Sequence, residues 1–407
     1  MSREGSESRS IRTDWSFLDD ALGATDAVGF VAAGGRRDDS LRYLTRFDGP
    51  DREYAFVRTA GATRESVLCA PAGFETKATR QFDGRVATER AGDPAGERAA
   101  AILDHSETGA ASDGEPPLVL VPPTIPHDAA VYLERAGYEL QSTTAVADAR
   151  RIKTDSEIDA IRGVQAAAVA AVRHAEGILA AADAAADADA GDGGGRELRW
   201  QDAPLTTDRL TREVNAELAR HGVSDVGNTV VSVGAHRSAG DGGTCEAVSI
   251  RTNEPIRIEV APRGSHGYHG ALTRTVVVDS DGGWDRRAYV AVESALDAGL
   301  SEIEAGADAG DVAREADAEL AAFGFDPTTG IELPDGPLDV GYGVGLSRRE
   351  SPPLRGGTAL EAGMVIAVAP GVADPEQGCV RLSALVVVTG SGYERLGDDS
   401  HSFSPRA

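Results

Sequence analysis

The sequence predicts a two-domain α+β protein, and three observations lead to this fold class. The chain has 407 residues, more than one ordinary hydrophobic core accommodates, so two domains are expected. Its first part alternates short helical and extended segments. Its second part interleaves helices with strands without a strict strand–helix–strand rhythm, which favours antiparallel pairing.

The N-terminal domain is expected to span residues 15–149 and to have an α/β fold. Residues 1–14 mix charged residues with Ser and lack an apolar stretch, so we expect them to be disordered. Residues 17–22 have the apolar spacing of an amphipathic helix. Apolar segments that predict strands follow at 28–31, 54–57 and 67–68.

Prolines mark the end of this domain. Pro116 and Pro117, then Pro122 and Pro123, interrupt regular structure before a helical stretch at 129–136. We expect the domain boundary within 148–154 and the second domain to span residues 150–400.

The second domain is expected to open with a helix. Thr154 and Glu157 have the spacing of a capping box, and apolar residues follow at helical intervals. Residues 183–195 are a run of Ala, Asp and Gly without large apolar side chains, which predicts a flexible insertion. The later elements are predicted as helices at 205–221 and 286–305 and as strands at 229–233, 256–260, 273–278, 363–368 and 380–388.

The charge balance is strongly acidic. The chain carries 66 Asp and Glu against 40 Lys and Arg, a formal charge of −26 that disfavours nucleic acid and anionic membranes as partners. Lys77 and Lys153 are the only lysines. A carboxylate-rich surface with few lysines suits a cytoplasm full of salt, so we interpret the chain as a halophile's cytoplasmic protein. The alternative is an acidic mesophilic protein with arginine-biased codons.

The three cysteines, Cys69, Cys245 and Cys379, are odd in number and widely spaced, so neither a disulfide framework nor a zinc cluster is expected. The sequence shows no signal peptide and no apolar run long enough for a membrane span.

Four stretches of the second domain carry glycines, aromatic residues and charges in a characteristic order. They are Gly267-Tyr268-His269-Gly270 with Arg274 and Thr275, then Gly341-Tyr342-Gly343-Val344-Gly345-Leu346 with Glu350 and Pro352, then Leu360-Glu361-Ala362-Gly363-Met364-Val365 with Pro370 and Gly371, and finally Val380-Arg381 with 385–389. Together they resemble the pita-bread peptidase family, which includes methionine aminopeptidase, aminopeptidase P, prolidase and creatinase.

A weaker match lies in the first domain. Residues 41–47, Leu-Arg-Tyr-Leu-Thr-Arg-Phe, resemble a Tyr-Leu-Thr-Gly-Phe segment of the creatinase and aminopeptidase P branch. The resemblance thus covers nearly the whole chain. It implies a creatinase-like α/β N-terminal domain, a C-terminal pita-bread domain and a homodimer.

The resemblance also implies a catalytic centre of two divalent metals such as Mn, Co or Zn, held by two Asp, one His and two Glu. Carried onto this sequence, those five positions fall on Glu259, Ala271, Tyr342, Ala369 and Ser383. Alanine offers no lone pair, and a neutral tyrosine or serine replaces imidazole or carboxylate poorly. Only Glu259 could still bind metal, so we predict no metal and no other cofactor.

Two histidines of the family that face the substrate are also replaced. Their positions fall on Asp241 and Arg349. Creatinase uses a His as acid and base without metals, and this route is therefore closed unless another residue has taken over.

Several other side chains remain as ligand-binding candidates. His236, His266 and His269 could form a relocated metal site, although His266 and His269 are three apart in an extended hairpin and should point to opposite faces. Glu259 is expected to pair with Arg274 or Arg381. Asp241 and His269 remain as candidates for binding a ligand. Arg348, Arg349 and Arg381 could line a site for an anion; the alternative is that these arginines are solvated or paired with structural carboxylates. Cys245 lacks a neighbouring base and is not expected to act as a nucleophile.

The sequence therefore predicts a non-catalytic homologue of Xaa-Pro aminopeptidases and prolidases that binds a peptide or small ligand or serves as an interaction platform. The alternative is an enzyme, either an aminopeptidase or dipeptidase with a rebuilt site or a metal-independent hydrolase that uses Asp241, Glu259 or Tyr342.

Overall fold

The computed structural model describes residues 11–88, 92–105, 116–185, 195–223, 226–234, 247–325, 338–397 and 400–406. Internal contacts divide the chain into two compact units, Met1–Arg150 and Arg151–Ala407. Of the sequence predictions, residues 1–10 and most of the 183–195 segment lie outside the described residues, as do Asp241, His236 and Cys245.

The first unit is built on a six-stranded mixed sheet with the strand order β4-β3-β2-β1-β5-β6. The β1–β2 and β2–β3 pairs are antiparallel, and the other pairs are parallel. The strands are β1 (Gly29–Gly34), β2 (Tyr54–Thr59), β3 (Ser66–Ala70), β4 (Arg85–Thr88), β5 (Leu118–Val121) and β6 (Glu139–Ser142). The helices are α1 (Ser16–Thr25), α2 (Asp39–Thr45), α3 (Glu75–Gln81), α4 (Ala95–Asp104), α5 (His127–Arg135) and α6 (Ala145–Arg151).

Both faces of this sheet are covered, which explains why its central strands are apolar at successive positions. Small and branched side chains of β1, β2, β3 and β5 pack against α4 and α5. On the other face, Phe30, Phe56 and Leu68 are fully buried, and Trp15 and Phe82 contact Phe56 ring to ring. The predicted α/β architecture of this unit is therefore present.

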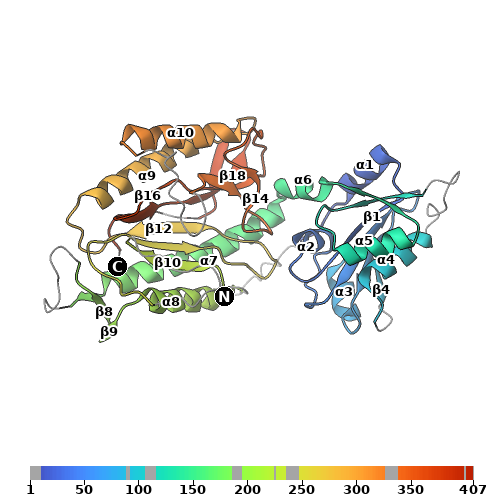
Figure 1. Cartoon of the computed structure of the whole chain (residues 1–407), viewed down its shortest axis with the longest axis horizontal. Coiled ribbons are helices and arrows are strands. Elements are labelled where there is room, and N and C mark those ends of the chain that lie inside the picture. The colour runs from blue at the N-terminus through green and yellow to red at the C-terminus, as the bar shows by residue number, and fades with distance from the viewer. Residues whose placement is uncertain are drawn as a thin grey trace, which may run out of the picture. The chain divides into compact units, whose positions relative to one another are not determined.

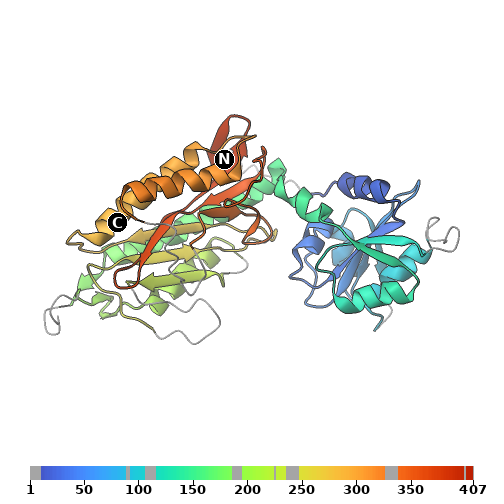
Figure 2. The same cartoon turned by 45° about the horizontal axis from the view of Figure 1, so that its top comes forward.

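The second unit consists of two main sheets between two pairs of helices (Figures 1 and 2). One sheet has the order β10-β11-β12, and the other has the order β14-β13-β15-β18-β19, with a β16–β17 hairpin beside them. These strands are β10 (Thr229–Val233), β11 (Ile256–Val260), β12 (Leu272–Val276), β13 (Gly341–Gly343), β14 (Glu350–Pro353), β15 (Val365–Val368), β16 (Gly371–Asp374), β17 (Gly378–Arg381), β18 (Ala384–Thr389) and β19 (Gly392–Arg395). All pairings in both sheets are antiparallel.

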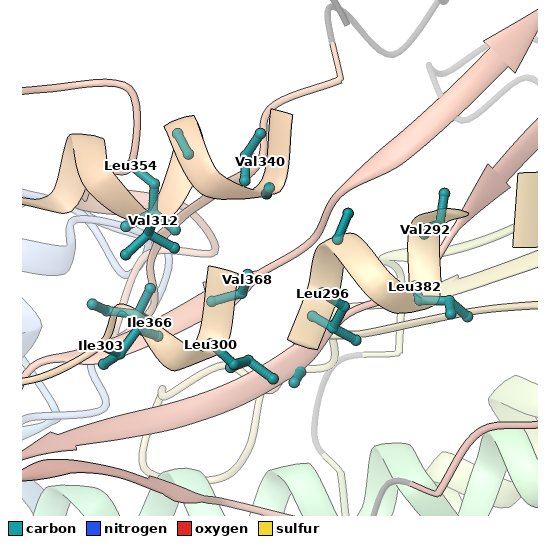
Figure 3. Close-up of a cluster of buried hydrophobic side chains, with 14 of the residues drawn as sticks. Val292, Leu296, Leu300, Ile303, Val312, Val340, Leu354, Ile366, Val368 and Leu382 are labelled. Carbon is teal, nitrogen blue, oxygen red and sulfur yellow. The ribbon is translucent and has the colours of Figure 1, made fainter. Parts of the chain in front are cut away.

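Helices cover one face of each sheet. Helices α7 (Asp155–Ala180) and α8 (Thr207–Arg220) lie against the three-stranded sheet, and α9 (Trp284–Ser301) and α10 (Ala309–Ala322) lie against the five-stranded sheet. Figure 3 shows part of the hydrophobic core between α9, α10 and the five-stranded sheet, which includes Leu296 and Leu300 of α9 and Ile366 and Val368 of β15. A small sheet of β7 (Asp183–Ala184), β8 (Leu198–Trp200) and β9 (Ala203–Pro204) completes the unit.

Several predicted elements differ from the structure. The strand expected at 380–388 is two strands, β17 paired with β16 and β18 paired with β15. The interruption lies at Leu382 and Ser383, whose backbone N–H groups donate to the carbonyls of Pro370 and Thr273. Helix α9 ends at Ser301 instead of residue 305, and α10 was not predicted. Residues 183 and 184, expected in a flexible insertion, form β7.

No helix among the described ranges is long and apolar enough to cross a membrane.

Candidate functional site

The face of the three-stranded sheet that points away from α7 and α8 carries polar and charged side chains. In β11, the isoleucine and valine side chains pack into the core beside these helices. Because strand side chains alternate, Arg257 and Glu259 point to the opposite face, which we call the inner face. The register places Thr275 opposite Arg257 and Thr273 opposite Glu259. Ala271, two residues before Thr273, continues the same row.

The five-stranded sheet has a corresponding inner face. Ile366 and Val368 of β15 pack beneath α9 and α10, so Ala367 and Ala369 point the other way. Tyr342 of β13 lies directly opposite Ala367. The backbone N–H of Ala369 donates to the carbonyl of Val340 at 2.6 Å, which extends this pairing by one step.

Hydrogen bonds join the edge strand β12 to residues 381–383, which lead from β17 into β18 of the five-stranded sheet. The Thr273 N–H donates to Ser383 Oγ at 2.7 Å, and the Ser383 N–H donates to the Thr273 carbonyl at 3.1 Å. Next to this pair, Thr275 Oγ1 donates to the Arg381 carbonyl at 2.9 Å. Since Glu259 lies opposite Thr273, these bonds bring Glu259 and Ser383 into the same region.

The five positions predicted from the motif order therefore converge on the two inner faces. Ala271, Ala369 and Ser383 are buried, with 4%, 2% and 2% of their surface exposed, whereas Glu259 and Tyr342 are partly exposed. Ala271 is held at both backbone polar groups by the side-chain amide of Gln165, at 2.9 and 3.1 Å.

The chemistry of this set does not fit a dinuclear metal centre. Such a centre needs bridging carboxylates and a terminal imidazole. Ala271 and Ala369 have no side-chain lone pair, and Ser383 Oγ already accepts the Thr273 N–H. In the part of the chain that the structure describes, no group of three or more His, Cys, Asp or Glu is arranged to hold a metal ion.

Arginines occupy the surroundings of the Tyr342 and Ala369 positions. The guanidinium carbon of Arg349 lies 4.6 Å from the centroid of the Tyr342 ring, and Arg349 Nη1 donates to Asp339 Oδ2 at 3.3 Å. Arg381 is buried and donates from Nε to the Ala369 carbonyl at 3.0 Å and from Nη2 to the Asp339 carbonyl at 2.7 Å. Tyr342 and Arg349, two residues matched to family histidines, thus form a stacked pair.

The expected pairing of Glu259 with Arg274 is wrong for a geometric reason. Arg274 lies opposite Ile258 in the register, so its side chain leaves β12 on the face away from Glu259. Arg274 Nη1 instead donates to the carbonyls of Thr273 and Ser383, both at 2.7 Å. The expected pairing of Glu259 with Arg381 is also not formed: among the described residues, the Arg381 guanidinium donates to the carbonyls of Ala369 and Asp339.

The histidine candidates are separated by their environments. His269 is buried. Its backbone N–H donates to the Gly345 carbonyl at 2.8 Å, and its ring Nδ1 lies 3.2 Å from the Ala261 carbonyl. His266 is exposed in a turn instead of the extended hairpin that was predicted. The remaining candidate, Asp241, lies outside the described residues.

Sequence reasoning missed three polar side chains that shape this region. Arg257 shares the inner face with Glu259 and donates to Ser232 Oγ at 3.1 Å; its spacing of two residues from Glu259 in a predicted strand was the available signal. Lys153 donates to Glu350 at 2.6 Å in a buried ion pair and so connects the start of α7 to the segment after Arg349. No sequence signal marks Asp339.

Comparison with known proteins decides the family. The profile of metallopeptidase family M24 matches residues 159–390, which is more than half of the chain. The chain belongs to metallopeptidase family M24. The predicted resemblance is therefore confirmed.

Curated relatives of this M24 chain include peptidases from archaea and bacteria. An Xaa-Pro dipeptidase of Pyrococcus furiosus is 29% identical over 202 residues, which cover 47% of this chain and 55% of the relative. An uncharacterized peptidase of Bacillus subtilis, YqhT, is 33% identical over 136 residues, 32% of this chain and 35% of the relative. The matched stretches thus span about half or less of these relatives.

Solved structures with the same fold cover nearly the whole chain. The prolidase from Pyrococcus furiosus superposes with a TM-score of 0.75 at 20% identity, covering 94% of this chain and 100% of that one. The Xaa-Pro dipeptidase from Bacillus anthracis has a TM-score of 0.76 at 20% identity, covering 96% and 98%. The predicted fold, an N-terminal α/β domain followed by a pita-bread domain, is confirmed.

Proposed function

We propose that this M24 chain does not hydrolyse peptides and instead binds a peptide or small molecule at the inner faces of its two sheets. The observation that carries this proposal is the donor set. Of the five positions matched to the family's metal ligands, only Glu259 has a carboxylate, and Ala271 and Ala369 have no side-chain donor.

A single carboxylate cannot assemble a dinuclear centre. Two adjacent divalent cations bring four positive charges, which several carboxylates must offset. Ser383 Oγ is engaged by the Thr273 N–H, and the ring of Tyr342 is covered by the Arg349 guanidinium. The chain therefore retains the scaffold of the family without the groups that activate water.

The relatives support peptides as one ligand class, because they are named as an Xaa-Pro dipeptidase and a peptidase. A homodimeric interaction platform in the cytoplasm of a halophile belongs to the same proposal and rests on the family resemblance and on the charge of −26. The rival function is hydrolysis by a rebuilt site that uses Asp241, Glu259 or Tyr342.

An activity assay tests the proposal. Purified full-length chain is incubated with Xaa-Pro dipeptides in concentrated KCl, with Mn²⁺, Co²⁺ or Zn²⁺ added or with EDTA. We expect no turnover in any condition. Turnover abolished by EDTA would establish a metallopeptidase, and EDTA-resistant turnover lost in Glu259→Gln or Asp241→Asn would establish the metal-independent hydrolase.

A reconstituted variant supplies the positive control. The five substitutions E259D, A271D, Y342H, A369E and S383E restore the family's donor set on this scaffold. If the scaffold is otherwise intact, the folded variant gains bound Mn²⁺ that the wild-type chain lacks.

A further inference from the structure

We infer that Arg381 and Arg349 form a binding site for an oxyanion, a carboxylate or a phosphate, on the inner face of the five-stranded sheet. This inference deepens the proposed function and rests on it, because a pair of metal cations in the same region would repel an arginine site. The two arginines indicate an anionic ligand, whereas the five positions matched to the family's metal ligands indicate no ligand chemistry.

The first observation is the buried charge of Arg381. Only 4% of its surface is exposed, and its side chain donates to two neutral groups, the carbonyls of Ala369 and Asp339. Among the described residues, no carboxylate forms an ion pair with it. A buried cation without a counter-ion costs free energy, since charges removed from water are ordinarily paired. An anionic ligand would provide the missing counter-ion.

The contrast with Lys153 shows that this chain does pair buried cations elsewhere. Lys153, whose side chain is 2% exposed, is 2.6 Å from Glu350 Oε1, and the Glu350 side chain is 11% exposed. Lys153 and Arg381 both lie in the second unit. The buried ammonium of Lys153 is thus matched by a carboxylate, whereas the Arg381 guanidinium donates to carbonyls alone among the described residues.

Arg349 adds a second and more accessible cation. Its guanidinium stacks on the Tyr342 ring, and its one hydrogen bond to the described part of the chain, from Nη1 to Asp339, is 3.3 Å long. The side chain is 35% exposed. Guanidinium groups carry five donors, so the Nε and Nη2 edge of Arg349 remains available for the two oxygens of one oxyanion.

Asp339 brings the two arginines together. Its carbonyl accepts from Arg381 Nη2 and its carboxylate from Arg349 Nη1. Both guanidinium groups therefore contact Asp339. The Ala369 carbonyl contacts the guanidinium of Arg381, and the Tyr342 ring contacts that of Arg349. The ring offers an apolar wall for the organic part of a carboxylate ligand.

The local charge supports the same reading. The inner faces carry the carboxylates of Glu259 and Asp339 against the guanidinium groups of Arg257, Arg349 and Arg381, an excess of one positive charge among these described residues. The whole chain has a formal charge of −26. A positive region on a strongly negative molecule attracts small anions to that region.

The test is a calorimetric titration of the full-length chain with two probes, succinate and inorganic phosphate, at constant ionic strength. Three variants are compared: Arg349→Gln, Arg349→Lys and, as a matched control, Arg348→Gln. Arg348, which the sequence also suggested for the anion lining, is exposed and forms no hydrogen bond or ion pair within the described part of the chain, so the structure does not place it in this site. We expect saturable binding of at least one probe, unchanged in Arg348→Gln and weaker by about tenfold in Arg349→Gln, because a charge-assisted hydrogen bond is lost. Arg349→Lys, which keeps the charge without the fork, should lie between them.

Two results would overturn the inference: no saturable binding of either probe by the folded wild-type chain, or equal affinities in Arg349→Gln and Arg348→Gln. Which probe binds distinguishes a carboxylate ligand from a phosphate ligand. This outcome is separable from that of the proposed function, since peptide turnover with bound metal refutes the latter whether or not Arg349 binds oxyanions.

Discussion

Glu254 is a partly buried carboxyl group whose ionisation state depends on pH in the neutral range. Burial raises the pKa of Glu254 from an ordinary value of 4.5 to about 7, although the Arg251 N–H donates to its carboxylate at 2.8 Å and opposes the change. The folded chain therefore holds this proton at pH values where the unfolded chain has released it.

The sign of the effect on stability follows from linkage. Between pH 4.5 and about 7 the folded state binds more protons than the unfolded state, so the contribution of Glu254 to stability is full below pH 4.5 and is lost as the pH rises to about 7. We expect Glu254→Gln, which keeps an acceptor for Arg251, to raise the free energy of unfolding at pH 8 by on the order of 2 kcal/mol.

Urea unfolding at several pH values measures this effect. The control is Glu376→Gln, an exposed glutamate in the β16–β17 turn. An equal pH dependence in the Glu254→Gln variant and in the control would contradict the assignment.

Motif order selected candidate residues that lie near one another in the structure, but it did not give their contacts. Glu259 and Tyr342 lie on the inner faces, and Arg381 donates to the carbonyl of Ala369. The partners of Arg381 are backbone carbonyls 12 and 42 residues away in the sequence, and backbone carbonyls leave no residue-type signal. The sequence therefore suggested that Arg381 or Arg274 pairs with Glu259, whereas Arg381 donates to these carbonyls and the register turns Arg274 away from Glu259.

At the level of elements, local signals with a direct physical cause were the most informative. The capping box predicted from Thr154 and Glu157 is confirmed, with both reciprocal hydrogen bonds at the start of α7. The strands predicted at 229–233 and 256–260 have the same bounds in the structure, because their alternating branched residues pack on one face. These features depend on residues close together in the sequence.

Elements that depend on distant contacts were predicted less well. Helix α10 was missed because most of its buried positions are alanines, such as Ala309, Ala313 and Ala316, which give a weak hydrophobic periodicity. The interruption between β17 and β18 arises where Ser383 bonds to Thr273, a residue 110 positions away. Apolar patterning alone cannot show such an interruption.

The cap of α7 gives a prediction for this scale. Thr154 Oγ1 accepts from the Glu157 N–H, and the Glu157 carboxylate accepts from the Thr154 N–H at 2.8 Å. Thr154→Ala should lower the free energy of unfolding by about 1 kcal/mol. The matched control is Thr154→Ser, which keeps the hydroxyl group and should behave like the wild type in denaturant unfolding. Equal losses in both variants would show that the hydroxyl is not what stabilises the helix start.

For the whole molecule, the excess of carboxylates predicts how stability depends on salt. With a formal charge of −26, the folded chain repels itself at low ionic strength. Screening shortens the Debye length from about 10 Å at 0.1 M salt to about 3 Å at 1 M. We therefore expect the midpoint of thermal unfolding to rise with KCl concentration across this range, as measured by circular dichroism.

The mesophilic alternative predicts a different curve. An acidic protein that is not adapted to salt should show little further gain once the first part of the repulsion is screened. A midpoint that is constant or falls with added KCl would contradict the interpretation as a halophile's protein.

The central claim is that a member of metallopeptidase family M24 keeps its fold without the side chains that hold two catalytic metals. Elemental analysis by mass spectrometry, on full-length chain exchanged into Mn²⁺, Co²⁺ or Zn²⁺ and then passed through gel filtration, tests it most directly. We predict a metal content far below one ion per chain, against a clear gain in the reconstituted variant. Two ions per wild-type chain that survive gel filtration would contradict the account.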